Sequence, residues 1–515
     1  MSSVAVAVAV VLAGVSLHAR PPSALPKKSL HRLRGGAVDE SGGTSETWDY
    51  VIIGGGAAGC VLAERLSADP ENRVLLLEAG TDGSRDMRIR VPAGLVKVFK
   101  SERDWDFDTE PVPGTNRGVY LCRGKVLGGS SSTNVMLYHR GTPADYDSWV
   151  QKGAVGWGPS EVLDYFRRAE DNRAGGASQY HGTGGPMPVD DVPYVNELST
   201  AFLEACGGLG YRRNLDFNDW SAPQDGFGRF KVTQNNGERC SAHNAYLQNS
   251  DAMRRPNLRV CSGAHVTKVH LEGAEADLCA SGVAYVDDKA EACRAQLAAG
   301  GEVLLCAGAV QSPQILMLSG VGPRAHLEEL GIDVRKDVPG VGDGLQDHPA
   351  VLVSYGSKKH VSITDEIKWM GSSLPNPVTL LRWLLYKRGA LTSVACEFGG
   401  FFRTAKEHAQ PDLQVRSIAT SPPLSLLSRP SSPTPLSNLQ VRFIAARAMS
   451  ADGISTLEKM GAGAKMASGY TCQIIAVRPS SAGKVRLRSA DPIGEARPHS
   501  PTCLLWPADS PTSLL

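Results

Sequence analysis

The sequence predicts an α/β fold, and three observations lead to this prediction. The chain has 515 residues, enough for two or more domains with a sizeable core. Its 55 glycines fall mostly in short turn-like clusters, which suits an α/β protein with many tight turns. Between Tyr50 and Glu78, a strand pattern, a glycine turn, a helix pattern and a second strand pattern follow one another, as a βαβ unit requires.

Charge and cysteine content exclude several classes of partner. The 54 basic and 53 acidic residues give a net charge of +1, so no bulk charge points to nucleic acid. The eleven cysteines form no C-x-x-C pair and no Cys/His spacing suited to zinc, so we expect no structural metal. We expect most of them to be small buried apolar residues in a reducing compartment. No obligate protein partner is evident.

The N-terminal segment, residues 1–47, is predicted to be a disordered transit peptide. Met1 to Val38 contain no acidic residue but five arginines and lysines, together with several Ser and Pro. The apolar run Val4–Leu17 is shorter than the roughly 20 residues that cross a bilayer. This composition favours a plastid or chloroplast location, and a secretory signal remains the alternative.

The segment from Tyr50 to Glu78 has the features of a dinucleotide site. The apolar run Tyr50–Ile53 leads into the glycines of a G-x-G-x-x-G motif, Gly54, Gly56 and Gly59. Their expected roles are, in order, a tight turn, close approach of the backbone to a pyrophosphate, and helix packing on the sheet. After the amphipathic segment Cys60–Leu66 and the run Val74–Leu77, Glu78 stands where a carboxylate accepts from a ribose diol. This unit alone leaves NAD and FAD equally open.

Four later stretches resemble signature blocks of the glucose–methanol–choline (GMC) flavoprotein oxidoreductases. They are Cys122–Trp149, Gly308–Pro323, Pro339–Pro349 and Val477–Pro492, and they follow the βαβ unit in the family's order. The resemblance implies FAD as the cofactor. It also implies the fold: a GMC-type, Rossmann-like FAD-binding domain with an α+β substrate domain, whose C-terminal part we expect to be missing from this chain.

The resemblance also implies which residues line the cofactor. Small residues from Gly128 to Ser131 let backbone amides lie against a flavin, and Asn134 offers a donor and an acceptor to its ring edge. Val266 is expected at the adenine end. Besides Gly54, Gly56 and Gly59, the implied cofactor-binding residues are Ala57, Ala58, Glu78, Val126, Ser130, Asn134, Val135, Met136, Leu137 and Val266.

We expect each domain to be assembled from separate segments. The FAD-binding domain takes residues 48–181 and 256–349, and the substrate domain takes 182–255 and 350–492. A low-complexity insertion at 417–442 and an aberrant tail at 493–515 interrupt the family pattern. We interpret both as translated non-coding sequence, with a genuine surface loop as the alternative.

Within the family, the chain resembles the algal fatty acid photodecarboxylases. The stretches that carry this resemblance include LYHRGTPADYDSW, GALTSVACEFGGFFRTA and PDLQVR. It implies blue-light-driven decarboxylation of long-chain fatty acids to alkanes or alkenes and CO₂, with Cys396 and the arginine of LQVR as catalytic, substrate-binding residues. Gln473 and Leu457 are implied in the same pocket, Leu457 where the branch has Tyr. Arginine suits this position because an ionised carboxylate in an apolar tunnel needs a permanent charge and a donor fork.

The motif LQVR occurs twice, so two arginines compete for this role. Arg416 keeps the family's spacing from Cys396, whereas Arg442 keeps its spacing from Leu457. We prefer Arg416.

Two other functions stay open. One is oxidation of an alcohol by a GMC dehydrogenase or oxidase, and the other is a truncated, non-catalytic flavin-binding remnant. Peripheral contact with plastid membranes is also left open, although we expect the run Leu380–Leu385 to be ordinary helix core.

Overall fold

The computed structural model describes residues 46–111, 118–368, 376–404, 407–418, 469–493 and 502–505. Outside the described residues lie Arg442, Leu457, all but the last two residues of the predicted transit peptide, and all but two residues of the 417–442 insertion.

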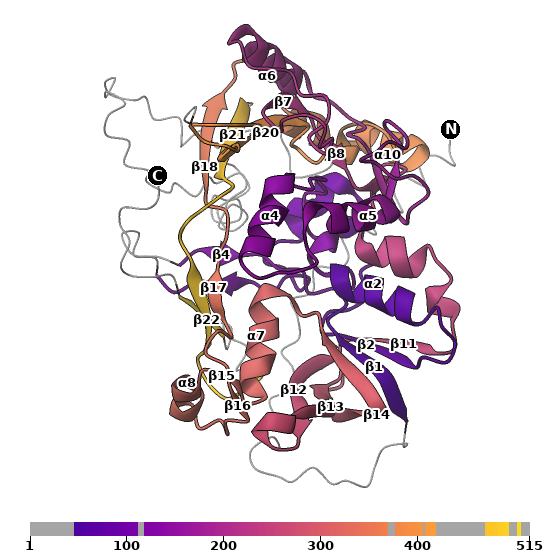
Figure 1. Ribbon diagram of the computed structural model, residues 1–515. Helices are drawn as coiled ribbons and strands as arrows, with labels where there is room; N and C mark the ends of the chain where they lie inside the picture. Colours follow the sequence, from indigo (N-terminus) through magenta and orange to yellow (C-terminus); the bar gives the residue numbers. More distant parts are fainter. Residues whose placement is uncertain are drawn as a thin grey trace, which may run out of the picture. The chain divides into compact units, whose positions relative to one another are not determined.

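The largest sheet has six strands in the order β11-β2-β1-β14-β13-β12 (Figure 1). Four of them are parallel: β1 (Thr47–Ile53), β2 (Val74–Glu78), β11 (Leu258–Ser262) and β14 (Ala292–Leu305). The other two, β12 (His265–Glu272) and β13 (Cys279–Val286), extend the sheet with antiparallel pairing. The predicted α/β class is confirmed.

The apolar runs in β1 and β2 are continuous because both faces of this sheet are covered. On one face Val51, Ile53 and Leu77 pack with Ile315 of helix α7 (Gly308–Leu318). On the other face Ile52 and Leu76 pack with Cys60 and Ala63 of helix α2 (Ala57–Leu66). The predicted strand, helix, strand and terminal Glu78 of the βαβ unit are confirmed.

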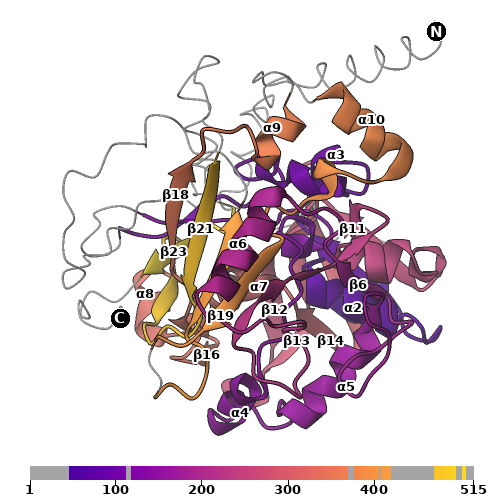
Figure 2. The same cartoon turned by 90° about the horizontal axis from the view of Figure 1, so that it is seen from above.

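A second sheet is antiparallel throughout, with five strands in the order β18-β21-β20-β19-β7. Its strands are β7 (Gly226–Arg229), β18 (Ala350–Gly356), β19 (Phe398–Phe402), β20 (Leu413–Ile418) and β21 (Gly469–Ala476). Helix α6 (Glu197–Gly208) packs against it (Figure 2). The two sheets draw their strands from the two sets of segments expected for the two domains, whose boundaries stay a prediction.

The other helices and strands lie outside these two sheets. The remaining helices are α3 (Met87–Arg90), η2 (Pro92–Lys97), η3 (Gly129–Ser132), α4 (Pro143–Gln151), α5 (Pro159–Ala169), η4 (His243–Gln248), η5 (Ala252–Arg254), η6 (Glu275–Asp277), α8 (Arg324–Glu329), α9 (Ile363–Ile367), α10 (Pro377–Tyr386) and η7 (Ala390–Thr392). The remaining strands are β3 (Phe107–Asp108), β4 (Tyr120–Leu121), β5 (Glu170–Asn172), β6 (Met187–Asp191), β8 (Lys231–Val232), β9 (Gln234–Asn235), β10 (Glu238–Arg239), β15 (Val321–Gly322), β16 (Lys336–Asp337), β17 (Asp343–Leu345), β22 (Gly483–Leu487) and β23 (Thr502–Leu505).

The run Leu380–Leu385 forms most of α10, and the expectation that it is core is wrong for most of its leucines. Trp383 is fully buried and Leu380 packs beside it. Leu381, Leu384 and Leu385 are exposed. A helix with apolar residues on all sides does not reveal from its sequence which side the protein covers.

Candidate functional site

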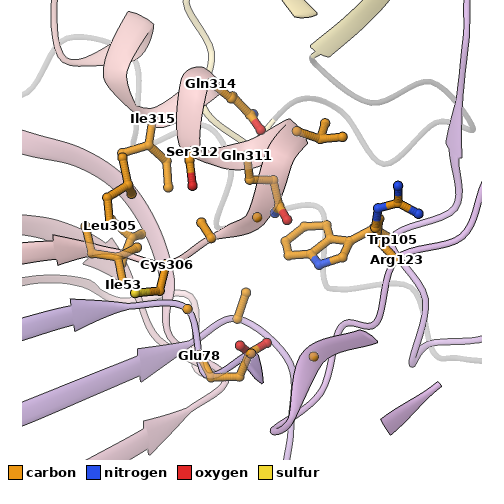
Figure 3. A pocket seen from close by; sticks show the side chains of 18 of the residues that line it. Ile53, Glu78, Trp105, Arg123, Leu305, Cys306, Gln311, Ser312, Gln314 and Ile315 are labelled. Carbon is orange, nitrogen blue, oxygen red and sulfur yellow. The ribbon is translucent and has the colours of Figure 1, made fainter. Parts of the chain in front are cut away.

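A cavity of about 470 Å³ lies at the carboxyl ends of β1, β2 and β14. In an open α/β sheet, ligands bind at this edge, where the loops after parallel strands converge. The walls come from the glycine turn, the N-terminal turns of α2 and α7, and the loop at Gly129–Ser131. Figure 3 shows Glu78, Trp105 and Gln311 reaching toward the same space from three separate segments.

The glycine turn is built for close backbone approach. Gly54 has a φ of +100°, and a Cβ there would lie 2.6 Å from the carbonyl oxygen of Cys306, so the turn requires glycine. A Cβ on Gly59 would lie 2.0 Å from the Gly54 oxygen, which fixes how close α2 comes to β1. Gly56 meets only one atom within 4 Å, at 3.9 Å, so the space before α2 is open.

Glu78 ends β2 as a buried carboxylate inside this edge. Its Oε2 accepts from the Gly55 amide at 2.8 Å, and its Oε1 accepts from the Gly80 amide at 2.7 Å. Burial raises the pKa of Glu78 to about 7, against the lowering effect of these amides and of Lys125. The carboxyl group is therefore poised to change its charge near neutral pH.

A second wall combines aromatic and basic side chains. Trp105 packs edge-to-face with His265, and the two ring centroids are 5.6 Å apart. The Lys125 ammonium lies 4.6 Å from the centroid of the Trp105 ring. Burial and the nearby Lys125 lower the pKa of His265 to about 4, so this imidazole is neutral at physiological pH. Sequence reasoning missed Trp105 and His265 because no local motif marks them.

Helix α7 supplies a third group of lining residues, also missed from the sequence. Gln311, Ser312 and Gln314 line the cavity from its first turns (Figure 3). The signal was present, since the second family signature begins at Gly308, three residues after β14 ends. Gly308 has a φ of +83°, which lets the chain turn from the strand into the helix.

The predicted cofactor residues divide into two groups. Lining the cavity are Gly54, Gly56, Ala57, Ala58, Glu78, Ser130 and Val266. The structure does not bring Gly59, Val126, Asn134, Val135, Met136 or Leu137 to its wall. Val126 is fully buried against Ile89 and Val98. The cofactor roles of all these predicted residues stay a prediction.

Asn134 is held by a buried arginine that sequence reasoning missed. Arg239 is 4% exposed, and its Nη1 donates to Asn134 Oδ1 at 2.8 Å and to the Ser131 carbonyl at 3.2 Å. Its Nε donates to the Ile89 carbonyl at 3.0 Å, while Nη2 has no hydrogen-bond partner in the described part of the chain. Burial lowers the pKa of Arg239 to about 9. A buried cation thus underlies the loop predicted to face the flavin.

Met136 connects this loop to Cys396. Both are 1% exposed and belong to one apolar cluster with Val192, Val232 and Val394. Met136 and Ala395, which precedes Cys396, have φ values of +58° and +62°, a conformation that costs energy for non-glycine residues. Two strained backbone positions therefore occur where the cofactor loop approaches the predicted catalytic cysteine.

The second sheet brings the other predicted substrate residues into one row. Arg416 of β20 lies opposite Gln473 of β21 and opposite Gly399 of β19. Gly399 follows Cys396 by three residues. The alternative arginine, Arg442, and Leu457 lie outside the described residues.

Glu397, directly after Cys396, is a further buried acid that the sequence did not reveal. It is 0% exposed, and its Oε2 and Oε1 accept from the hydroxyls of Ser199 and Ser393, each at 2.6 Å. Burial raises the pKa of Glu397. These bonds tie α6 and the segment before β19 to the backbone next to Cys396.

The residues present fit FAD. The first turn of α2 has no side-chain cap, so its N–H groups stay available to a pyrophosphate. Glu78 provides a carboxylate for a ribose, and Val266 with Leu305 provides apolar surface for a planar base.

Comparisons with known proteins agree with this reading of the site. Residues 48–350 match the family described as GMC oxidoreductase. The chain is 41% identical to the chloroplastic fatty acid photodecarboxylase of Chlamydomonas reinhardtii, over 87% of this chain and 69% of that protein. It is 36% identical to an alcohol dehydrogenase [acceptor] of Pseudomonas putida, over 87% of this chain and 73% of that protein.

One solved structure supports the fold at a greater distance. Pyridoxine 4-oxidase from Mesorbium loti is 28% identical and superposes with a TM-score of 0.67, covering 90% of this chain and 76% of that one. The fold and the site define a flavin-dependent oxidoreductase of the α/β class. The chain belongs to the GMC oxidoreductase family, and FAD is its cofactor, as the sequence predicted.

Proposed function

We propose that the chain catalyses blue-light-driven decarboxylation of long-chain fatty acids to hydrocarbons and CO₂. The observation that carries this proposal is the row across three adjacent strands, in which Arg416 pairs with Gln473 and with Gly399, the third residue after Cys396. The 41% identity to a fatty acid photodecarboxylase supports it.

Arg416 would hold the substrate carboxylate in its ionised form. A carboxylate moved into an apolar environment costs several kcal/mol unless a charged partner and hydrogen bonds replace water. Arginine stays charged at any working pH and donates through a fork that matches a carboxylate. Gln473, opposite Arg416 in the strand register, would offer an amide donor.

The net reaction is redox-neutral: R–CO₂⁻ and H⁺ give R–H and CO₂. The bond between the carboxyl carbon and its neighbour breaks, and one C–H bond forms. Bound FAD supplies light absorption and reversible transfer of one electron. Cys396 would act where the C–H bond forms, as a hydrogen source or by shaping the local hydrogen bonds, and both roles stay open.

Oxidation of an alcohol is the second candidate, because the chain is also 36% identical to an alcohol dehydrogenase and 40% identical to an oxygen-dependent choline dehydrogenase of Photobacterium profundum. That second identity extends over 72% of this chain and 63% of the dehydrogenase. A truncated, non-catalytic flavin-binding remnant is the third.

One experiment separates the three functions. The FAD-loaded chain is given palmitate under blue light, and in parallel a series of alcohols in anaerobic darkness. Our proposal requires a hydrocarbon one carbon shorter than palmitate and no bleaching of the flavin absorbance by alcohols. Bleaching in the dark would favour the dehydrogenase, and bound FAD without either response would favour the remnant.

We also propose a plastid location. The basic, acid-free composition of residues 1–38 supports it, as does the chloroplastic description of the Chlamydomonas relative.

A further inference from the structure

Helix α10 packs through one side against the described part of the chain. Trp383 is fully buried, and its indole Nε1 donates to the Gly237 carbonyl at 3.0 Å. Val91, Leu391 and the partly buried Leu380 belong to the same cluster. This side gives the helix a firm anchor, since a buried tryptophan contributes a large apolar surface.

The opposite side of α10 is apolar as well, and within the described part of the chain its side chains are exposed. Val378, Leu381 and Leu385 are 69%, 40% and 62% exposed, and their spacing of three and four residues puts them on one face. At about 100° per residue this face lies opposite Trp383. Isolated exposed leucines are ordinary, but a continuous apolar helix face in water indicates a binding surface.

Two arginines accompany this helix, Arg382 within it and Arg388 two residues after its end. Arg382 and Arg388 are exposed, and an open hollow is lined by Arg382, Arg388 and Tyr386. No hydrogen bond or ion pair of either guanidinium is found within the described ranges. Lys387 differs, because its ammonium lies 2.9 Å from Glu238 and 3.7 Å from the centroid of the Trp383 ring. The two arginines therefore remain available for an external anion.

We propose that α10 docks on an anionic lipid bilayer, with its leucines among the acyl chains and its arginines on lipid phosphates. Apolar residues beside arginine and tyrosine are typical of helices that lie in the membrane interface. No helix in the described part of the chain has the length and apolar character to span a bilayer. With ten residues, α10 can lie along the surface. A symmetric contact with a second copy would bring like charges of Arg382 and Arg388 together, which disfavours that occupant.

This inference does not rest on the proposed reaction, because it concerns a surface and not the flavin site. The experiment is flotation of the full chain with vesicles of phosphatidylcholine alone or mixed with phosphatidylglycerol. Two variants test the surface: Leu381→Ser with Leu385→Ser, and Arg382→Glu with Arg388→Glu. Matched controls alter exposed residues elsewhere: Leu215→Ser, and Arg212→Glu with Arg213→Glu.

We expect salt-sensitive binding to the phosphatidylglycerol vesicles, weakened about tenfold or more by each α10 variant and unchanged in the controls. Unaltered thermal unfolding would show that the variants fold, as expected for exposed positions. Failure to float with anionic vesicles would overturn the proposal, and so would equal binding by all variants. A leucine variant that changes oligomeric state on gel filtration without changing flotation would assign the surface to a second copy.

Discussion

At the scale of single residues, burial sets the charges at the flavin cavity. It raises the pKa of Glu78 to about 7 and lowers the pKa of His265 to about 4. It also lowers the pKa of Lys125. All three shifts disfavour the charged form, which is the effect of removing an ionisable group from water. The carboxyl group expected at the ribose, that of Glu78, therefore has a pKa close to neutral pH.

We predict that FAD affinity rises with pH through the titration of Glu78. Ribose hydroxyls donate to the ionised carboxylate, so binding favours the ionised form and releases a proton where the free group is protonated. With a free pKa of about 7, the affinity should increase about tenfold from pH 6 to pH 8 and level off above it. Calorimetry in buffers of different ionisation enthalpy measures both the affinity and the proton release.

Glu78→Gln is the control, because it keeps the shape but cannot titrate. Its FAD affinity should be lower at pH 8 and independent of pH across this range. A wild-type affinity that does not change between pH 6 and pH 8 would contradict the assignment.

Arg239 allows a second prediction at this scale. Arg239→Met removes the donor to the buried Ile89 carbonyl and the support of Asn134. We expect unfolding free energy to fall by about 1–3 kcal/mol, with weaker FAD binding, measured by urea denaturation and flavin fluorescence. Arg239→Lys should rescue little, since one ammonium cannot replace a fork that reaches three acceptors. Full rescue by lysine would mean that charge alone matters, and the exposed Arg213→Met provides the baseline.

At the scale of elements, the cavity depends on how closely α2 packs on β1. Gly59→Ala would put a methyl group 2.0 Å from the Gly54 oxygen, so the helix must move away from the sheet. We predict a loss of at least tenfold in FAD affinity and a lower melting temperature, measured by titration and by calorimetry.

Gly207→Ala in α6 is the matched control. Its Cβ would meet nothing within 4 Å, and alanine is favoured over glycine in a helix by about 1 kcal/mol. This variant should be slightly more stable and bind FAD normally. If Gly59→Ala behaved in the same way, the close helix packing would not matter for the cofactor.

At the scale of the whole molecule, local sequence predicts some parts well and others not at all. The βαβ unit was predictable because each step has its own local signal, from the apolar run of β1 to Glu78 at the end of β2. Trp105, His265 and Arg239 were not predictable, since they reach the site through packing between segments far apart in the chain. In α10, apolar residues occur on every side, so the sequence does not predict that Trp383 and Leu380 form the packed side.

The substrate side illustrates the same limit. Cys396 was chosen by resemblance, but its packing in one cluster with Met136, which stands far earlier in the chain, follows from the tertiary structure. The serines whose hydroxyls donate to Glu397 are Ser199 and Ser393, which lie 198 and 4 residues away from it in sequence. No motif in the sequence predicts that Glu397 is a buried acid. The surroundings of Cys396 and Glu397 therefore come from the tertiary structure and not from the family resemblance.

The measurement that tests the central claim most directly uses palmitate labelled at its carboxyl carbon. The FAD-loaded chain is illuminated with blue light, and labelled CO₂ and pentadecane are quantified against a dark sample and a Cys396→Ala variant. The account predicts equal amounts of both products in the light, none in the dark, and a large loss in the variant. Turnover that is equal in light and dark, or a flavin-loaded chain that releases no labelled CO₂ under illumination, would contradict it.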